Sequence, residues 1–417
     1  MALYELIGQR LGHSFSKPIH EALGAYAFHL HELPNEEAVR QYLAKRPFAG
    51  CNVTIPYKQT VIPLCDEIDE RAARIGAVNT LVNRGGRLTG YNTDYEGFAY
   101  MLGRKNISLR GKTVLLLGSG GTCKTAMAVA EDAGAAKILV ASRAPQKGQL
   151  AYQEAAGRAD VEVLINVSPA GMFPNNGSCL ANPAAFPNLQ AVADVVYNPL
   201  KTKLLFLAEE LGLPTAGGLP MLVEQAVAAA RLYTGRAFGQ QETERILRDM
   251  YSQLVSLVLV GMPSSGKSRL GKAVARKLHK TFVDLDHVLV AEAGKPISAI
   301  FEEGGEEAFR AAETRVLAEQ SKKAGIVLST GGGIVTRPEN LYYLRQNGIV
   351  FYLDRPLSKL QVGRGRPLSK SPEALAEMYR ARRPLYEAAA DLVVENNASF
   401  IQVANKIVEA YHAAVNP

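Results

Sequence analysis

The chain has 417 residues, of which 47% are hydrophobic and 21% are charged, and its formal net charge is +7. This length exceeds what one hydrophobic core usually supports, so we expect a multidomain protein with at least two cores. The composition excludes a disordered or fibrous protein, no apolar run reaches the ~20 residues of a membrane span, and dispersed basic residues argue against a nucleic-acid partner.

Short apolar runs, each ended by small or turn-forming residues, recur along the chain and predict β-strands. In the first half they cover 4–7, 50–54, 80–82, 114–117, 138–141, 161–165 and 193–196, and in the second half 257–260, 282–285, 326–329, 349–353 and 392–394. Because several runs are continuously apolar and alternate with helical patterns, we expect parallel sheets that are covered on both faces. Both halves should therefore have an α/β fold.

Three polar clusters, at residues 12–16, 51–58 and 90–94, lie at expected loop and strand ends. Such residues can converge on a polyhydroxylated acid. Lys58 and Asp94 would form a proton-transfer pair, in which the carboxylate orients the ammonium group and the lysine exchanges a proton with an oxygen being reduced or oxidised. Taken singly, Lys58 fits a surface charge better, and Asp94 fits a turn or cap residue better.

A glycine-rich turn follows the apolar run 113–117. Gly118, Gly120 and Gly121 separate this run from a helical pattern over 122–133, which is the order of the first βα turn of a dinucleotide-binding fold. A pyrophosphate would sit at this turn. The usual third glycine falls on Cys123, so a structural turn without a cofactor is the alternative.

The next predicted strand ends in Ser142 and Arg143. A site that prefers NAD tends to carry an acidic residue here for the ribose hydroxyls. Arg143, supported by Lys147, instead favours the 2′-phosphate of NADP, although an arginine after a strand is often simply solvated.

The four cysteines all lie in the first half and show no CxxC spacing, which predicts reduced thiols. Because the start of the sequence also shows no leader pattern, we expect a cytoplasmic protein.

The two halves are joined without a flexible linker. Residues 242–254 show a helical pattern with apolar Ile246, Leu247, Met250 and Leu254, and this pattern runs almost directly into the strand 257–260. We therefore expect the two halves to be held close together.

The segment 261–268, GMPSSGKS, fills every fixed position of a phosphate-binding loop, and it stands between a predicted strand and a helical pattern. Backbone N–H groups of the loop would face the phosphates, Lys267 would reach the β and γ oxygens, and Ser268 would ligate magnesium. The expected nucleotide-binding residues are Gly261, Ser264, Ser265, Gly266, Lys267 and Ser268. A chance glycine-rich turn is the alternative, which the flanking strand and helix disfavour.

Two acidic residues follow this loop in a segment that we interpret as a strand. Its alternation would place Asp284 and Asp286 on one face, so that one serves the metal and the other a substrate hydroxyl. Further along, the spacing of Arg310 and Glu313 in a helical pattern lets the glutamate orient the arginine. The glycines 331–333 permit close approach to a ligand, or simply form a tight turn.

Basic residues are locally concentrated in the second half. They are Arg364, Arg366, Lys370, Arg380, Arg382 and Arg383. Such residues can clamp phosphates and carboxylates, and a solvated basic face is the alternative.

A series of motifs fills the first half in this order: GHSFSKPIH, NVTIPYK, GAVNTLV, GYNTD, GSGGTCKTA, INVSPAGM, DVVYNP and GGLPMLVEQA. Together they resemble shikimate dehydrogenase over nearly all of residues 1–250. The resemblance implies a split substrate-binding domain, 1–97 with 218–252, and a Rossmann-like NADP-binding domain, 98–217. It also implies that Lys58 and Asp94 are the catalytic pair. The residues implied to hold shikimate are Ser14, Ser16, Thr54, Asn79, Asp94, Tyr197 and Gln225.

The second half carries GMPSSGKS, DLD, FRAAE, TGGG, GRPL and RRPLY. This series resembles shikimate kinase, which implies a P-loop α/β domain of the nucleoside-monophosphate-kinase kind over 256–417. Carried over, Lys267 and Ser268 handle phosphates and magnesium, Asp284 supports the metal, and Asp286 binds the reacting hydroxyl. Arg310, Gly332 and Arg382 would hold the shikimate carboxylate and ring. Arg366 would lie on a lid and neutralise the transferring phosphoryl group.

Together the two resemblances imply that the chain is a fusion of two consecutive enzymes that use NADP(H), ATP and Mg²⁺. The first would reduce 3-dehydroshikimate to shikimate, and the second would phosphorylate shikimate. One alternative is a quinate or related polyol-acid dehydrogenase joined to another small-metabolite kinase, and another is a regulatory protein in which one half only senses ligand. We expect small-molecule partners, no nucleic acid and no membrane, and the sequence leaves a homo-oligomer open.

Overall fold

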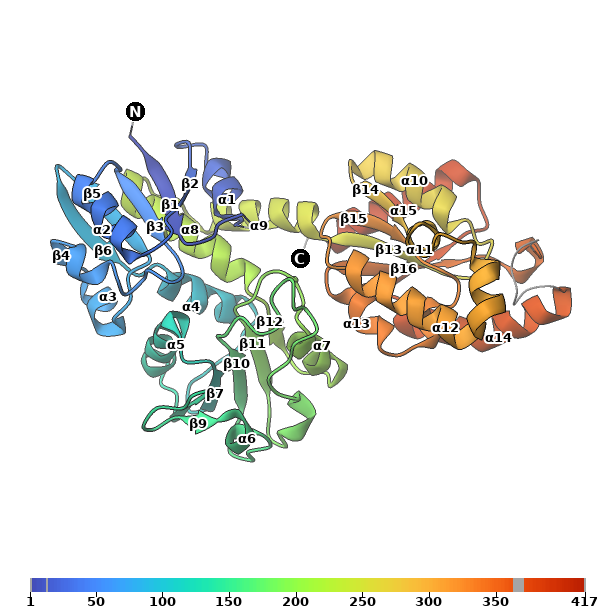
Figure 1. Cartoon of the computed structure of the whole chain (residues 1–417), viewed down its shortest axis with the longest axis horizontal. Coiled ribbons are helices and arrows are strands. Elements are labelled where there is room, and N and C mark those ends of the chain that lie inside the picture. The colour runs from blue at the N-terminus through green and yellow to red at the C-terminus, as the bar shows by residue number, and fades with distance from the viewer. Residues whose placement is uncertain (1, 13, 363–370, 416–417) are drawn as a thin grey trace. The chain divides into compact units, whose positions relative to one another are not determined.

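The structure is a computed structural model that describes all residues except 1, 13, 363–370 and 416–417. It divides into two compact units, Met1–Asn198 with Thr202–Leu247 and Pro199–Lys201 with Arg248–Pro417 (Figure 1). None of the described helices combines the length and apolarity that a membrane span needs.

The first unit begins with a six-stranded sheet in the order β2-β1-β3-β5-β6-β4. Its strands are β1 Tyr4–Gly8, β2 His29–Glu32, β3 Gly50–Val53, β4 Glu67–Ile68, β5 Thr80–Arg84 and β6 Arg87–Tyr91. The expectation of purely parallel sheets is wrong here, because β5 runs antiparallel to both β3 and β6. Only two glycines, Gly85 and Gly86, join β5 to β6, and a two-residue connection can link only antiparallel strands.

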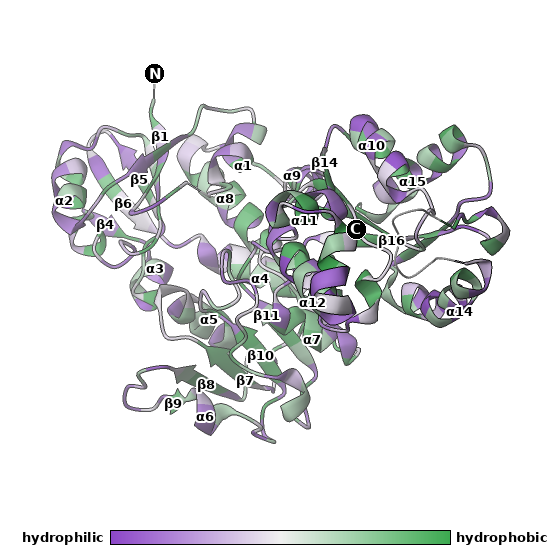
Figure 2. Ribbon diagram, turned by 45° about the vertical axis from the view of Figure 1, so that its right-hand side comes forward, coloured by the Kyte–Doolittle hydropathy of each residue, from purple (hydrophilic) through white to green (hydrophobic). Residues whose placement is uncertain are grey.

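The first unit continues into a second six-stranded sheet in the order β12-β11-β10-β7-β8-β9, in which every pairing is parallel. Its strands are β7 Thr113–Leu117, β8 Lys137–Ser142, β9 Leu150–Ala151, β10 Val163–Asn166, β11 Ala191–Asp194 and β12 Thr215–Ala216. The central strands are buried on both faces, as the continuous apolar runs predicted, and Figure 2 shows them as the most hydrophobic ribbons of this part.

Helices cover both sheets of the first unit. They are α1 Ser16–Ala22, α2 Glu36–Lys45, α3 Glu70–Ile75, α4 Asp94–Arg104, α5 Gly121–Asp132, α6 Tyr152–Ala155, α7 Lys203–Glu210 and α8 Leu219–Thr234. The chain returns to the first sheet through α8, since a β-carbon at Gly50 of β3 would lie 2.3 Å from the ring of Tyr233. Only glycine at position 50 lets this ring pack directly on the strand.

The helix α9, Gln240–Leu254, leads into β13, Ser256–Val260. The second unit has a five-stranded parallel sheet in the order β14-β15-β13-β16-β17. The other strands are β14 Thr281–Asp284, β15 Ile326–Ser329, β16 Gly348–Asp354 and β17 Leu392–Glu395. Separate apolar clusters cover its two faces, one around Val258 and Leu328 and the other around Leu257 and Ile407. This is the α/β fold that the sequence predicted for the second half.

Helices flank this sheet. They are α10 Lys267–Leu278, α11 Leu285–Ala293, α12 Ile297–Gln320, α13 Asn340–Arg345, α14 Pro372–Ala389 and α15 Phe400–Ala414. Short 3-10 helices occur at Ile62–Leu64, Pro183–Ala185, Ile334–Thr336 and Leu357–Lys359. The helix α12 is kinked at Gly305, where φ is 71°.

Several strands differ from the expected runs. The run 193–196 belongs to a strand that already ends at Asp194, and 161–165 is replaced by Val163–Asn166. The sequence missed β2, β4, β6, β9 and β12. The strand β2 is mostly exposed, so it lacks the apolar pattern on which the prediction depended.

Two candidate active sites

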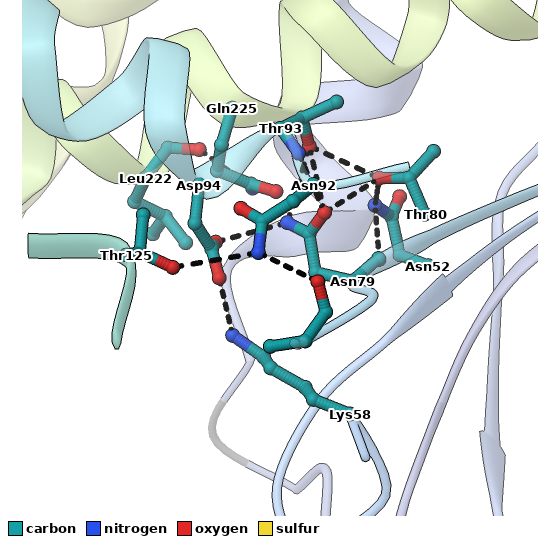
Figure 3. A network of polar contacts seen from close by, with 11 residues as sticks. Asn52, Lys58, Asn79, Thr80, Asn92, Thr93, Asp94, Thr125, Leu222 and Gln225 are labelled. Carbon is teal, nitrogen blue, oxygen red and sulfur yellow. Dashed lines mark hydrogen bonds and ion pairs between the residues drawn. The ribbon is translucent and has the colours of Figure 1, made fainter. Parts of the chain in front are cut away.

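The first candidate site is built around an ion pair. Lys58 follows β3 and Asp94 begins α4, and their Nζ and Oδ2 atoms are 2.6 Å apart (Figure 3). Their side chains are 16% and 9% exposed, so this is a pair withdrawn from bulk solvent, unlike a surface charge or a free helix cap. The positive end of the helix dipole stabilises the negative charge of Asp94.

A buried amide holds the second carboxylate oxygen. Asn79 donates from Nδ2 to Asp94 Oδ1 over 2.9 Å, and its own Oδ1 accepts from the backbone N–H of Thr93 over 2.7 Å. Thr80 adds a hydroxyl that contacts the Thr93 hydroxyl at 3.0 Å (Figure 3). Both oxygens of Asp94 are therefore held, and its orientation toward Lys58 is fixed by Asn79 and Thr93, which directly precede β5 and α4.

Two of the expected substrate residues, Ser14 and Ser16, lie at the start of α1. Ser16 is buried and its backbone N–H donates to Ser14 Oγ over 3.2 Å. The intervening Phe15 ring lies 5.5 Å from the ring of Tyr197, which brings the Ser14–Ser16 turn next to the loop after β11.

Thr54 and Gln225 complete the expected set. The backbone N–H of Thr54 bonds to Ile7 O over 3.0 Å, so Thr54 extends the end of β3. Gln225 lies on α8 and packs against Gly97 of α4, where a β-carbon would lie 3.1 Å from Gln225 Cβ, and its Nε2 donates to Leu222 O over 2.8 Å (Figure 3). The structure thus places Thr54 at the carboxyl end of β3, Ser14 and Ser16 at the start of α1, and Gln225 on the side of α8 that meets α4.

A buried acid that the sequence prediction missed anchors the Tyr197 loop. Asp194 accepts hydrogen bonds from Thr202 Oγ1 at 2.7 Å, Val196 N at 2.9 Å and Asn166 Nδ2 at 2.9 Å. Burial raises the pKa of Asp194 to about 7, and the three donors oppose this rise. The motif DVVYNP contains both Asp194 and Val196, but the side-chain donors Asn166 and Thr202 lie outside it, and no local pattern links them to Asp194.

The glycine turn at the end of β7 lies next to the stem of Lys58. Gly118 has φ 122°, and a β-carbon there would lie 2.9 Å from Ser168 Cβ, so only glycine fits. Gly120 and Gly121 open α5, whose first N–H groups suit the pyrophosphate of a dinucleotide. A β-carbon at Gly121 would lie 4.0 Å from Lys58 Cδ, so the cofactor turn and the lysine stem are neighbours. These residues fit a bound NADP.

The residues expected at the adenosine ribose follow the neighbouring strand. Ser142 ends β8, is buried, and lies with its Oγ 3.5 Å from Gln149 Oε1. Arg143 and Lys147 are both exposed in the turn that Gln149 closes through a 3.1 Å bond from Gln146 N. Two exposed cations at this place fit a 2′-phosphate.

The second candidate site begins at the phosphate-binding loop. Lys267 is buried, and its Nζ donates to Gly261 O at 2.8 Å and Met262 O at 2.9 Å, so the lysine spans its own loop. Ser268 Oγ lies 3.4 Å from the hydroxyl of Ser329, which ends the adjacent strand β15. The glycine at 266 has φ 92° and precedes the first residue of α10, which leaves the helix N-terminus open to phosphate.

The pair Asp284 and Asp286 lies differently from the expectation. The strand β14 ends at Asp284, which caps α11 by accepting from the backbone N–H of Asp286 over 3.2 Å. The prediction of alternate positions on one strand is therefore wrong, because the N-cap preference of Asp284 starts a helix at Leu285. The hard oxygen ligands Ser268 and Asp284 fit Mg²⁺, which keeps several waters of its own.

Acidic and basic side chains converge on the glycine turn after β15. A β-carbon at Gly331 would lie 2.1 Å from Glu313 Oε1 and 3.1 Å from Asp286 Oδ1, and one at Gly333 would overlap the Arg310 guanidinium. Position 332 packs against Pro263 of the phosphate-binding loop, where a β-carbon would come within 2.6 Å. The glycines are therefore required by close approach, and the turn joins the loop to the charged cluster.

Arginines 310 and 382 are both buried at this turn. Arg310 Nη1 bonds to Glu313 Oε2 over 2.6 Å, and Arg382 Nη1 donates to Gly332 O over 3.0 Å. Burial raises the pKa of Glu313 and nearby Asp286 adds to this, whereas Arg310 opposes it. Arg383, by contrast, is exposed and paired with Glu387 at 2.9 Å.

The sequence analysis did not predict two residues of this site, and one predicted residue lies outside the part of the chain that the structure describes. Tyr386 donates its hydroxyl to Gly332 O, and Ser329 faces Ser268. Ser329 could have been found as the last residue of the predicted strand 326–329. Arg366 lies outside the described residues.

The fold and the two sites define a class of protein: a dinucleotide-dependent dehydrogenase joined to a P-loop phosphotransferase. The family model for the shikimate dehydrogenase substrate binding domain matches residues 6–81, and the model for shikimate kinase matches residues 263–412. The chain belongs to the shikimate dehydrogenase family and carries a shikimate kinase domain after the dehydrogenase.

Known relatives and structures agree with this assignment. The shikimate dehydrogenase (NADP(+)) of Clostridium perfringens strain 13 is 35% identical over 267 residues, which are 60% of this chain and 98% of that protein. Among solved structures, a chorismate mutase/shikimate 5-dehydrogenase fusion protein from Clostridium acetobutylicum matches 60% of this chain and 97% of its own, with 32% identity and a TM-score of 0.56. The shikimate 5-dehydrogenase from Thermus thermophilus, solved with NADP(H) and shikimate, matches 60% of this chain and 99% of its own, with 32% identity and a TM-score of 0.54.

Proposed function

We propose that this chain catalyses two consecutive reactions. The first reduces 3-dehydroshikimate to shikimate with NADPH, and the second phosphorylates the 3-hydroxyl of shikimate with MgATP. The observation that carries the proposal is that a proton-transfer pair beside a dinucleotide turn and a phosphate-binding loop beside a carboxylate-binding cluster occur in one chain. The family assignments supply the shared substrate.

In the first reaction, bound NADPH supplies the hydride that adds to the ketone carbon. Lys58 donates a proton to the carbonyl oxygen, which becomes the hydroxyl, and Asp94 keeps the ammonium group aimed at this oxygen. Asn79 holds Asp94 in place through its 2.9 Å bond. Arg143 and Lys147 would bind the 2′-phosphate, while Gly118, Gly120 and Gly121 admit the pyrophosphate.

The substrate is held by hydroxyl and amide groups around this pair. We assign this role to Ser14, Ser16, Thr54, Asn79, Tyr197 and Gln225. The hydroxyls of Ser14 and Ser16 suit a carboxylate, because neutral donors bind it without bringing a further charge into the site. The Thermus protein was solved with NADP(H) and shikimate, which supports these two ligands for the first site of this chain.

In the second reaction, bound MgATP supplies the phosphoryl group. Lys267 and the loop N–H groups stabilise the phosphate oxygens, and Ser268 and Asp284 hold the metal. Asp286 accepts a hydrogen bond from the 3-hydroxyl and so orients it for attack. Arg310 and Arg382 bind the substrate carboxylate, and their burial strengthens this charge pairing. Arg366 belongs to the same proposal, as the cation that neutralises the transferring group.

The proposed division of the chain follows the two activities. Residues 1–97 and 218–252 form the substrate-binding domain of the dehydrogenase, 98–217 its NADP-binding domain, and 256–417 the kinase. We place the enzyme in the cytoplasm, since its four cysteines are free and such thiols suit a reducing compartment.

One reaction vessel tests the whole proposal. Purified protein is given 3-dehydroshikimate, NADPH and MgATP, and NADPH absorbance and products are followed together. We expect NADPH oxidation followed by shikimate 3-phosphate. Parallel assays with quinate and NAD separate a polyol-acid dehydrogenase from the proposed enzyme, and faster turnover with that pair would overturn the substrate assignment. Binding without turnover of either substrate would indicate a ligand sensor instead.

A further inference from the structure

One polar side chain of the second unit links the edge strand to the phosphate-binding loop. Asn396 directly follows β17 and is 5% exposed. Its Nδ2 donates to Ser265 O over 2.6 Å, across 131 positions of the sequence. Its backbone N–H donates to Asp354 O over 2.7 Å, which extends the pairing of β16 and β17 by one residue. The backbone of Asn396 is thereby fixed in the sheet, and its side chain is hydrogen-bonded to the loop.

The path of the loop explains how this contact is reached. The strand β16 lies between β13, which carries the loop, and β17. Gly261 has φ 146°, and a β-carbon there would lie 2.8 Å from Leu353 O, so the loop packs directly over the end of β16. Because of this close approach, the far side of the loop comes within reach of the residue that follows β17.

The contact fixes one peptide of the loop. In a planar trans peptide the C=O and the N–H point in opposite directions. With the Ser265 carbonyl held by Asn396, the N–H of Gly266 points away from Asn396. Gly266 itself packs on this side chain, since a β-carbon there would lie 3.6 Å from Asn396 Nδ2. Phosphate-binding loops hold their ligand with such outward N–H groups.

We propose that Asn396 is a positioning residue of the phosphate-binding loop, which holds the Ser265–Gly266 peptide in the orientation that binds the nucleotide phosphates. The proposal rests on the proposed kinase function and adds a residue outside the glycine-rich motif. Ser265 is fully buried, so without the amide its carbonyl would lose its donor in a place that water reaches poorly. The peptide could then rotate, and the loop would no longer be preformed.

Two substitutions in the full-length chain test this role. Asn396→Ala removes the donor, and Asn396→Asp keeps the shape but sets an acceptor against the Ser265 carbonyl. The matched control is Asn397→Ala, because Asn397 is exposed and its side chain donates to Glu395 Oε2 over 3.1 Å, within the same stretch of chain. Calorimetry measures the Kd of MgADP. Initial rates of phosphorylation give kcat, the KM of ATP and the KM of shikimate, which reports shikimate affinity at the kinase site alone.

We expect both Asn396 variants to bind MgADP roughly tenfold more weakly or worse, from the loss of one buried hydrogen bond. The KM of ATP should rise, while shikimate affinity and dehydrogenase activity stay at the parent values, and Asn397→Ala should match the parent throughout. MgADP affinity equal to the parent's overturns the proposal. A parallel loss of both affinities with a lower unfolding midpoint also overturns it, because that pattern marks a general stabilising contact.

The test also separates this role from the proposed kinase function. If the parent binds MgADP but does not phosphorylate shikimate, the proposed reaction is wrong, and the MgADP comparison still decides the role of Asn396. If the parent binds no MgADP, both proposals fail.

Discussion

Lys58 Nζ and Asp94 Oδ2 lie 2.6 Å apart, although 36 positions separate the two residues in the chain. The lysine comes from the turn after a strand and the aspartate from the first turn of a helix, so only the packing of α4 beside the first sheet brings them together. An ammonium group held in this way can give its proton to one oxygen at a defined place, which is what reduction of a ketone needs.

Replacing Lys58 by alanine should abolish dehydrogenase turnover while leaving the kinase active. We expect kcat for 3-dehydroshikimate to fall by about 10²–10⁴-fold, the usual contribution of a general acid. Initial rates of NADPH oxidation measure this, and phosphorylation of added shikimate serves as the internal control. Lys17→Ala is the matched variant, because Lys17 forms a partly exposed pair with Glu21. A Lys58→Ala enzyme that reduces the ketone at the parent rate would contradict the proton-donor role.

Replacing Lys267 by alanine should have the converse effect. The buried ammonium group is the charge placed to meet the β and γ phosphate oxygens, and we expect kcat for phosphorylation to fall by about 10²-fold or more. In the coupled vessel, NADPH oxidation should continue and shikimate should accumulate, as measured by chromatography. Lys272→Ala, an exposed position on the same helix, should behave as the parent. Shikimate 3-phosphate formed at an undiminished rate would count against the assignment of this loop.

Replacing Arg143 by alanine should change cofactor preference. Loss of a charge-assisted bond to the 2′-phosphate should raise the KM of NADP(H) about tenfold, whereas the KM of NAD(H) should change little. Steady-state kinetics with both cofactors give the ratio, and Arg40→Ala on the exposed face of α2 is the control. Equal losses for the two cofactors would show that Arg143 supports the fold of the turn instead.

Replacing Glu313 by alanine should weaken shikimate binding in the kinase. Arg310 would lose its 2.6 Å partner inside the protein, and breaking a buried pair costs about 3–5 kcal/mol. We expect a higher Kd for shikimate and a lower unfolding midpoint of the second unit, with MgADP affinity retained. Glu313→Gln keeps the shape and a hydrogen-bond acceptor, so it should recover part of the binding. Unchanged shikimate affinity in both variants would remove Glu313 from the site.

Acidification should destabilise the first unit through His20. This side chain is fully buried against Phe28, and burial lowers its pKa to about 3. Between pH 6.5 and 3 the unfolded chain binds a proton that the folded chain does not, so the stability contribution is full above pH 6.5 and falls as pH falls. At pH 5 the loss should reach about 2 kcal/mol.

Residual dehydrogenase activity after heating at each pH, assayed at one common pH, measures this effect. His20→Gln should flatten the acid limb, while His29→Gln, at an exposed position of the same unit, should keep it. An acid limb of the parent shape in His20→Gln would assign the titration to another group. Residual kinase activity in the same samples reports the second unit separately.

The short motifs were predictable from the sequence because their chemistry depends on neighbouring residues. The loop 261–268 and the turn 118–121 each bind an anion through consecutive backbone groups, and glycine at fixed spacing is a local requirement. The continuous apolar runs likewise predicted the parallel sheets around β7 and β13, because nearly every residue of a strand that is buried on both faces is apolar.

The sequence by itself thus determined the two α/β halves and the order of the two activities, and it supplied the candidate residues of both sites. Only the tertiary structure decided that Tyr386 joins Arg382 at Gly332, that Asn166 and Thr202 hold Asp194, and that Asn396 holds Ser265. Each of these depends on which distant residues pack together. Contacts between residues that are far apart in the chain leave no periodic pattern in the sequence. The sequence therefore shows the candidate residues of a site but not the residues that orient them.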